Sequence, residues 1–113
     1  MKRLAICAVL TSAFSACSSG TPVAFHNTSE HRLESVVISG SGFEASLGAI
    51  APGQSITVDV YPSGESGLDV SFAAKGQDYS YGPQDYFEGG GSYKVSATVN
   101  QDLTVAVSSE ISL

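Results

Sequence analysis

The chain has 113 residues, of which eleven are acidic and five basic, and its formal net charge at pH 7 is −6. This length fits one domain, since domains commonly run to about 100–150 residues. The negative charge repels phosphate backbones, which excludes nucleic acid as an expected partner. Both cysteines, Cys7 and Cys17, lie in the first seventeen residues, so the rest of the chain can form neither a disulfide nor a cysteine metal site.

The first seventeen residues have the order of a bacterial secretory signal peptide. Lys2 and Arg3 precede an apolar run over residues 4–10, and residues that are small apart from Phe14 follow as far as Cys17. The apolar run is shorter than the roughly 20 residues that cross a bilayer core, which argues against a transmembrane helix. We therefore expect residues 1–16 to be a signal peptide.

The end of this segment, Phe14-Ser15-Ala16-Cys17, resembles the lipobox of bacterial lipoproteins, with Phe14 where leucine is usual. The resemblance implies that Cys17 is acylated, with palmitate among its acyl chains, and becomes the first mature residue. Ser18 stands where an aspartate often retains such proteins at the inner membrane, so the resemblance implies the outer membrane of the cell envelope. The alternative is a cut after Ala13, which would give an ordinary secreted protein.

A mature chain that begins at Cys17 loses Lys2 and Arg3, and its net charge becomes −8. Anionic headgroups would repel this chain, so its attachment to the membrane would depend on the lipid on Cys17. Residues 17–22 are small and polar, and we expect them to be a tether. Residues 23–113 then form the folded domain.

Apolar and polar residues alternate through most of this domain, which predicts β-strands. The clearest example is Leu68, Val70, Phe72 and Ala74, whose side chains should face inward together. Pro52-Gly53 suits a type II turn, because glycine accepts a positive φ at the third position. The expected strands cover residues 23–27, 33–39, 43–47, 56–60, 68–74, 93–99 and 103–107.

No apolar period of three and four residues occurs in residues 17–113, so no amphipathic helix is expected. Seven or eight short strands separated by Gly/Pro turns predict an all-β fold, a small immunoglobulin-like or transthyretin-like β-sandwich of antiparallel strands. The chain has no tryptophan, so the Cys–Trp–Cys core of antibody domains is absent. The prediction is therefore an architecture and not a family.

Catalytic and metal-binding residues are sparse. The chain has two histidines, His26 and His31, and no Gly-x-Ser-x-Gly elbow, so we do not expect an enzyme. Glu30 and Glu34 lie near the two histidines and could complete a zinc or copper site. If Phe25 faces the core, however, His26 faces solvent with nothing to hold it beside His31. We therefore expect no metal and no cofactor.

The strongest functional candidate is the aromatic segment over residues 78–88. We predict that this segment is a loop, which ends at Gly89-Gly90-Gly91. Tyrosines on a glycine-rich loop offer rigid contact area and a hydroxyl for hydrogen bonding. Tyr86 and Phe87 are consecutive and cannot both face one core, so one of them should be exposed. The candidate partner or ligand surface comprises Tyr79, Tyr81, Asp85, Tyr86, Phe87 and Glu88.

The tyrosines have a second interpretation. Tyr79, Tyr81 and Tyr93 could instead be half-buried strand residues at the edge of a sheet, as tyrosines often are in β-proteins. The predicted function is a lipid-anchored, non-catalytic envelope protein that binds another protein in an assembly or accessory role. The alternatives are a shallow site for a carbohydrate or small cation, and a purely structural envelope domain.

Overall fold

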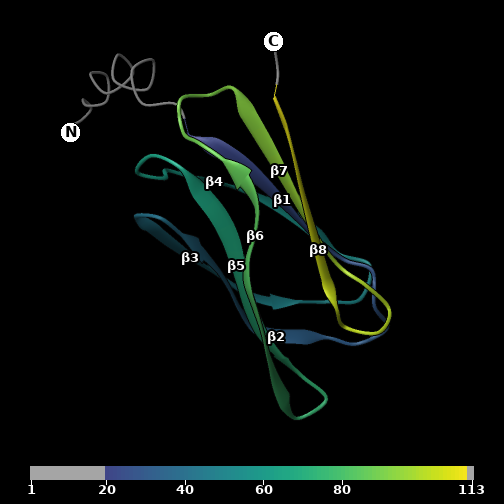
Figure 1. The fold of residues 1–113 in the computed structure, drawn as a ribbon. Coiled ribbons are helices and arrows are strands. Elements are labelled where there is room, and N and C mark those ends of the chain that lie inside the picture. Colours follow the sequence, from purple (N-terminus) through teal and green to yellow (C-terminus); the bar gives the residue numbers. More distant parts are fainter. Residues whose placement is uncertain (1–19, 112–113) are drawn as a thin grey trace, which may run out of the picture.

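The structure is a computed structural model that describes residues 20–111 (Figure 1). Its strands are β1 (Thr21–Asn27), β2 (Leu33–Gly40), β3 (Phe43–Ile50), β4 (Ser55–Val60), β5 (Ser66–Ala74), β6 (Gln77–Phe87), β7 (Tyr93–Val99) and β8 (Val105–Ile111). They form two four-stranded sheets, in the orders β4-β1-β7-β8 and β3-β2-β5-β6. The predicted all-β sandwich is confirmed. The predicted signal peptide and Cys17 lie outside the described residues.

Five of the six strand pairings are antiparallel, and the sixth, between β1 and β7, is parallel. A parallel pair needs a long connection between its strands. β1 and β7 meet this condition because five strands separate them along the chain. Among residues 20–111, no helix has the length and apolar character needed to cross a membrane.

β1 begins two residues earlier than predicted. Thr21 and Pro22 pair with Val60 and Asp59 of β4, so the predicted tether over residues 17–22 is wrong at its end. The hydroxyl of Thr21 donates a hydrogen bond to the Glu88 carbonyl at 3.0 Å. Proline has no backbone N–H to donate to a neighbouring strand. Pro22 is tolerated because β1 pairs with β7 only from Val23 onward, so no hydrogen bond to β7 is lost at this position.

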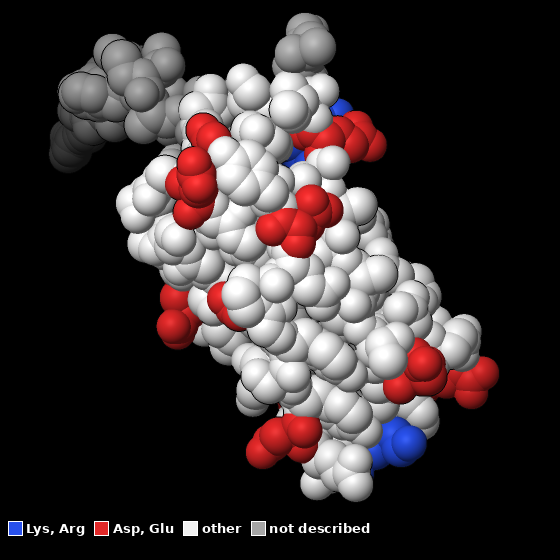
Figure 2. Space-filling view, in the orientation of Figure 1, with Lys and Arg blue, Asp and Glu red and all other residues white. Residues whose placement is uncertain are grey.

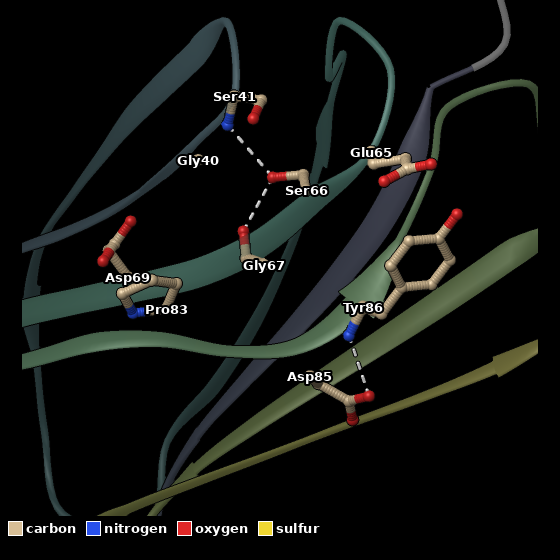
Figure 3. Close-up of a pocket in the computed structure, with 9 residues that line it drawn as sticks. All are labelled: Gly40, Ser41, Glu65, Ser66, Gly67, Asp69, Pro83, Asp85 and Tyr86. Carbon is tan, nitrogen blue, oxygen red and sulfur yellow. Dashed lines mark hydrogen bonds between the residues drawn. The ribbon is translucent and has the colours of Figure 1, made fainter.

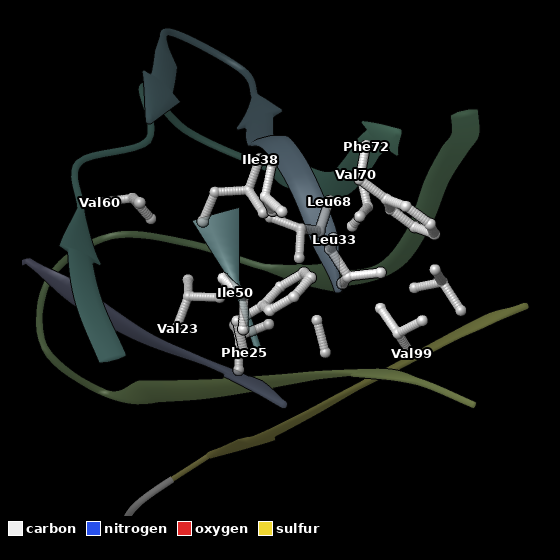
Figure 4. Packing of buried hydrophobic residues seen from close by; sticks show 14 of the residues in the cluster. Val23, Phe25, Leu33, Ile38, Ile50, Val60, Leu68, Val70, Phe72 and Val99 are labelled. Carbon is white, nitrogen blue, oxygen red and sulfur yellow. The ribbon is translucent and has the colours of Figure 1, made fainter. Parts of the chain in front are cut away.

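The core lies between the two sheets and comes from the alternating apolar residues (Figure 4). Phe25 is among its fully buried side chains. The four inward residues predicted for β5 are all buried, and the residues between them are half-buried. Residues contributed by the other strands include Val23, Leu33, Val36, Ile38, Ile50, Val60, Val95, Ala97 and Val99.

β-Bulges interrupt the alternation in β2 and β3. Leu33 and Val36 are both buried although they are three residues apart, because the register shifts between them. Ser35, within this shift, has φ 51°. On the facing strand, Gly48 lies opposite Val36 and has φ 74°. An extra residue in one strand exchanges the inward and outward positions that follow it.

The last strand starts later than predicted. Leu103 belongs to the turn before β8, where its N–H donates to the Asn100 carbonyl at 2.9 Å and its φ is 69°. Its side chain is nevertheless buried, which explains why it fits the apolar alternation. The turn at Pro52-Gly53 is confirmed, since Gly53 has φ 80° and the Gln54 N–H donates to the Ala51 carbonyl at 3.0 Å.

Candidate interaction surface

The aromatic segment is a strand and not a loop. Residues 77–87 form β6, which pairs with β5 and is the edge strand of its sheet. Tyr79 and Tyr81 are half-buried and lie 5.3 and 6.4 Å, between ring centroids, from Phe72 of β5. The Tyr81 hydroxyl donates to the Leu103 carbonyl at 2.7 Å. The interpretation of Tyr79 and Tyr81 as half-buried edge-strand residues is therefore confirmed. For Tyr93 it is wrong in part, because Tyr93 is half-buried but lies on β7, an inner strand of the other sheet.

Two register shifts bend β6 near its end, between the pairs Val70–Tyr81, Leu68–Gln84 and Ser66–Phe87. In each interval, β6 holds three residue steps against two in β5. The bend brings β6 against β8 of the other sheet. The Gln84 amide donates to the Val105 carbonyl at 3.2 Å, and the Ser109 hydroxyl donates to the Tyr86 carbonyl at 2.7 Å. Side chains thus close this side of the sandwich.

Of the consecutive pair Tyr86 and Phe87, the second is fully buried and the first is 43% exposed. The prediction that one of them is exposed is confirmed. The Tyr86 ring makes an edge contact with Tyr93, 6.2 Å between centroids, and its hydroxyl donates to a carboxylate oxygen of Glu88. The ring is therefore held from two sides although it faces solvent.

The same environment keeps the Tyr86 phenol protonated. The hydrogen bond to Glu88 is the largest cause of a rise in the pKa of Tyr86 to about 12, followed by desolvation and the negative charge of Glu65. Each of these effects disfavours the phenolate. A tyrosine with the ordinary pKa of about 10 is already neutral near pH 7, and the rise extends the neutral form of Tyr86 to more alkaline pH.

An open groove of about 470 Å³ lies beside Tyr86 (Figure 3). It is lined by Gly40, Ser41, Glu65, Ser66, Gly67, Asp69, Pro83, Asp85 and Tyr86. A Cβ on Gly40 would clash with the Ser66 hydroxyl, and a Cβ on Gly67 would lie 3.0 Å from the Pro83 Cβ. Glycine at these two positions therefore allows the strands to approach and keeps the groove open.

The carboxylates around the groove differ in orientation. Glu65 lies beside the Tyr86 ring, and Asp69 lies beside Pro83 (Figure 3). The Asp85 carboxylate instead accepts hydrogen bonds from the Tyr86 N–H at 2.9 Å and from the Ser109 hydroxyl at 3.1 Å. Glu65 and Asp69 are thus the acidic groups open to a ligand.

Acidic side chains are spread over the visible face of the molecule, with few basic ones between them (Figure 2). Within residues 20–111 one ion pair forms, between Arg32 and Glu34 at 2.6 Å. It is separate from the groove, so the described part of the chain offers Glu65 and Asp69 no cationic partner of its own.

The structure brings together only part of the predicted surface. Asp85 and Tyr86 line the groove and Glu88 fixes the Tyr86 ring, whereas Phe87 belongs to the core. Sequence reasoning missed Ser66 and Glu65, because nothing local to residues 62–67 distinguishes groove residues from an ordinary turn. Pairing of β5 with β6 brings them to Tyr86.

The two histidines have separate environments. The ring of His26 is hydrogen-bonded to the Ser55 hydroxyl at 2.8 Å, and the backbone carbonyl of His31 accepts from the Asn27 amide at 2.8 Å. In the described part of the chain, no group of three or more His, Cys, Asp and Glu side chains could hold a metal ion.

No protein-family model matches the chain, and no curated protein matches it. The chain is similar in structure to a protein from Eubacterium rectale solved by NMR, with a TM-score of 0.53. The two are 17% identical, and the match covers 79% of this chain and 86% of that one. A likeness at this identity shows a shared fold and no more.

Proposed function

We propose that this chain is a lipid-anchored, non-catalytic protein of the bacterial cell envelope that binds another protein through the surface around Tyr86. The sequence Phe14-Ser15-Ala16-Cys17 supports the anchor, and the outer membrane is its expected location. The partner is expected to be a protein of the same compartment.

The exposed and immobilised ring of Tyr86 carries the proposal. Tyrosines are enriched at the energetic centres of protein interfaces, where they bury a large area and retain a polar group. A ring that is already fixed by Tyr93 and Glu88 loses little conformational freedom on binding. The adjoining groove gives a partner side chain a place to enter.

Photo-crosslinking in the native cell tests this proposal. A photoreactive residue at Tyr86 should give one discrete protein adduct in the membrane fraction, whereas the same residue at exposed Gln101 should give none. A Cys17→Ser chain should leave the membrane fraction, because it lacks the acylated thiol. No adduct at Tyr86, or equally diffuse adducts at both positions, would exclude this surface as a protein-binding site.

One observation favours a second candidate function, binding of a small organic cation. Glu65 and the face of Tyr86 lie beside one another at the groove (Figure 3), and a carboxylate with an aromatic face is a combination that attracts cations. A thermal-shift screen with amines separates the two functions. Stabilisation by one class of amine would favour the cation site over the protein interface.

A further inference from the structure

The two sheets have four edge strands, β4, β8, β3 and β6. The unpaired N–H and C=O groups of an edge strand are a template for another strand, and proteins usually protect them with bulges, proline, charge or covering side chains. β6 has Pro83 and two bulges, and β3 has a bulge at Gly48. β8 is contacted by Gln84 and, through Ser109, by the end of β6.

Among residues 20–111, β4 has none of these protections except one charge. Its six residues pair with β1 in an uninterrupted register, without proline or glycine, and Asp59 is its single charged residue. Within the part of the chain that the structure describes, β4 is therefore the regular, open edge. An edge left in this state indicates a pairing surface.

The register shows which backbone groups of β4 are free. The Asn27 N–H donates to the Gln54 carbonyl at 3.0 Å, at the end of the β1–β4 pair. Hydrogen-bonded positions recur at every second residue of an antiparallel pair, so Ile56, Val58 and Val60 direct their N–H and C=O groups to β1. The backbone groups of Ser55, Thr57 and Asp59 therefore face outward.

We propose that β4 pairs antiparallel with β4 of a second copy of this chain, with Val58 opposite Val58 of that copy. Thr57 then lies opposite Asp59 of the second copy, so the outward backbone groups meet one another. Ile56 lies opposite Val60 of the second copy on the inner face. This register pairs every residue of β4 and places no two like charges opposite each other.

Two features favour a second copy as the occupant. Eleven acidic residues give each copy a negative charge, so two copies repel one another over most of their surfaces. β4 carries only one of these residues, and the register places it opposite a neutral threonine. Tyr61, one residue beyond β4, is 57% exposed, and its ring lies over Gly20, where a Cβ would be 3.0 Å from Tyr61 Cζ. The register places Tyr61 opposite Ser55 of the second copy, at the end of the paired strands.

The pairing would join two four-stranded sheets into one of eight strands, in the order β8-β7-β1-β4-β4-β1-β7-β8. This number is within the roughly ten strands that open sheets commonly reach. The half-buried side chains of Ile56 and Val58, which pack against the core from this edge, would be covered further.

Cysteine crosslinking of the full chain in cells tests the pairing. At a position opposite itself without backbone hydrogen bonds, the Cα atoms lie about 4.5 Å apart, within disulfide range. A Val58→Cys chain treated with a mild oxidant should give a disulfide dimer above the background of the unsubstituted chain. Ile56→Cys is the matched control, on the same face and equally half-buried. Its partner thiol would be about 13 Å away, at four residue steps, so it should stay at background.

A Thr57→Pro substitution added to Val58→Cys provides the second arm. The Thr57 N–H faces outward, so proline removes a bond to the second copy without removing one to β1. The dimer should be lost while the domain keeps its thermal transition. No dimer from Val58→Cys, equal dimers from Val58→Cys and Ile56→Cys, or a disulfide between the Val58→Cys chain and a different protein would each overturn the proposal.

Discussion

At the scale of single residues, Asn27 joins parts of the chain that are distant in sequence. It is almost fully buried at the end of β1. Its amide donates to the carbonyls of His31, Ile50 and Ala51 at 2.8, 3.2 and 3.2 Å. Its carbonyl oxygen accepts from both the N–H and the hydroxyl of Ser29, at 3.0 and 2.7 Å. Asn27 thereby connects β1 to the end of β3 in the other sheet.

We expect Asn27→Ala to lower the free energy of unfolding by about 3 kcal/mol, because it removes the buried acceptor of the Ser29 N–H and hydroxyl and a buried donor to the Ile50 carbonyl. Asn100→Ala is the control, since the Asn100 amide makes an exposed bond to the Thr104 hydroxyl at 3.1 Å, and it should lower this free energy by less than about 1 kcal/mol. Denaturant titration of both variants measures the difference. Equal losses would contradict this role of Asn27.

The sequence could not predict this role. Asn27 marks the end of an alternating segment and the start of a polar loop, and asparagine is usually exposed. Two of its partners, Ile50 and Ala51, are more than twenty residues away and meet it only in the folded chain. The exposure of either Tyr86 or Phe87 could be predicted, because it depends only on the alternation of a strand.

At the scale of strands, the glycine in the β3 bulge permits a backbone conformation that other residues rarely adopt. Gly48 has φ 74° and nothing within 4 Å of where a Cβ would lie. A substitution there would meet no steric clash, so its whole effect would come from the left-handed backbone.

Gly48→Ala should therefore reduce the free energy of unfolding by roughly 1–2 kcal/mol. The matched control is Gly82→Ala, where the Cβ also meets nothing within 4 Å and φ is not positive. It should be neutral or stabilise by up to about 1 kcal/mol, because it restricts the unfolded chain. Thermal unfolding compares the two variants, and similar melting temperatures would exclude strain at Gly48 as the difference.

Strands without bulges could be predicted from the sequence, and β5 is the best example because its period of two is unbroken. The sequence of β6 instead predicts a loop, because Gly82-Pro83 interrupts its alternation. An edge strand can accommodate both residues, since a bulge absorbs them and one side needs no ladder partner. Leu103 shifts the predicted start of β8 because a buried turn residue has the same apolar character as a strand residue.

At the scale of the whole molecule, charge opposes the folded state. The described residues hold all eleven acidic residues but only Arg32, Lys75 and Lys94 as basic ones. The one ion pair among them has both side chains more than half exposed, at 61% and 54%. Attraction between opposite charges therefore contributes little to stability, and added salt has little of it to screen. Like charges held together by the fold repel one another, and dissolved ions reduce this repulsion.

We expect the melting temperature at pH 7 to rise between about 0.01 M and 0.5 M sodium chloride, as the screening length falls from about 30 Å to a few ångströms. The same comparison near pH 4, where carboxylates take up protons, should give a much smaller rise. A fall in melting temperature at pH 7 would show that attraction, not repulsion, dominates the surface.

The placement of β1 also determines how the domain responds to force. β1 follows directly on the proposed tether and lies between β4 and β7, bonded to both along most of its length. A pull ahead of Thr21 that is opposed from the Asn27 end of the domain acts along the axis of β1. The bonds on both sides are therefore loaded together in shear, and they cannot open one at a time like a zipper. A partner that pulls on Tyr86 instead acts close to Thr21, whose hydroxyl donates to the Glu88 carbonyl, so that load would pass through the first residues of β1 and would leave the rest of the strand unloaded.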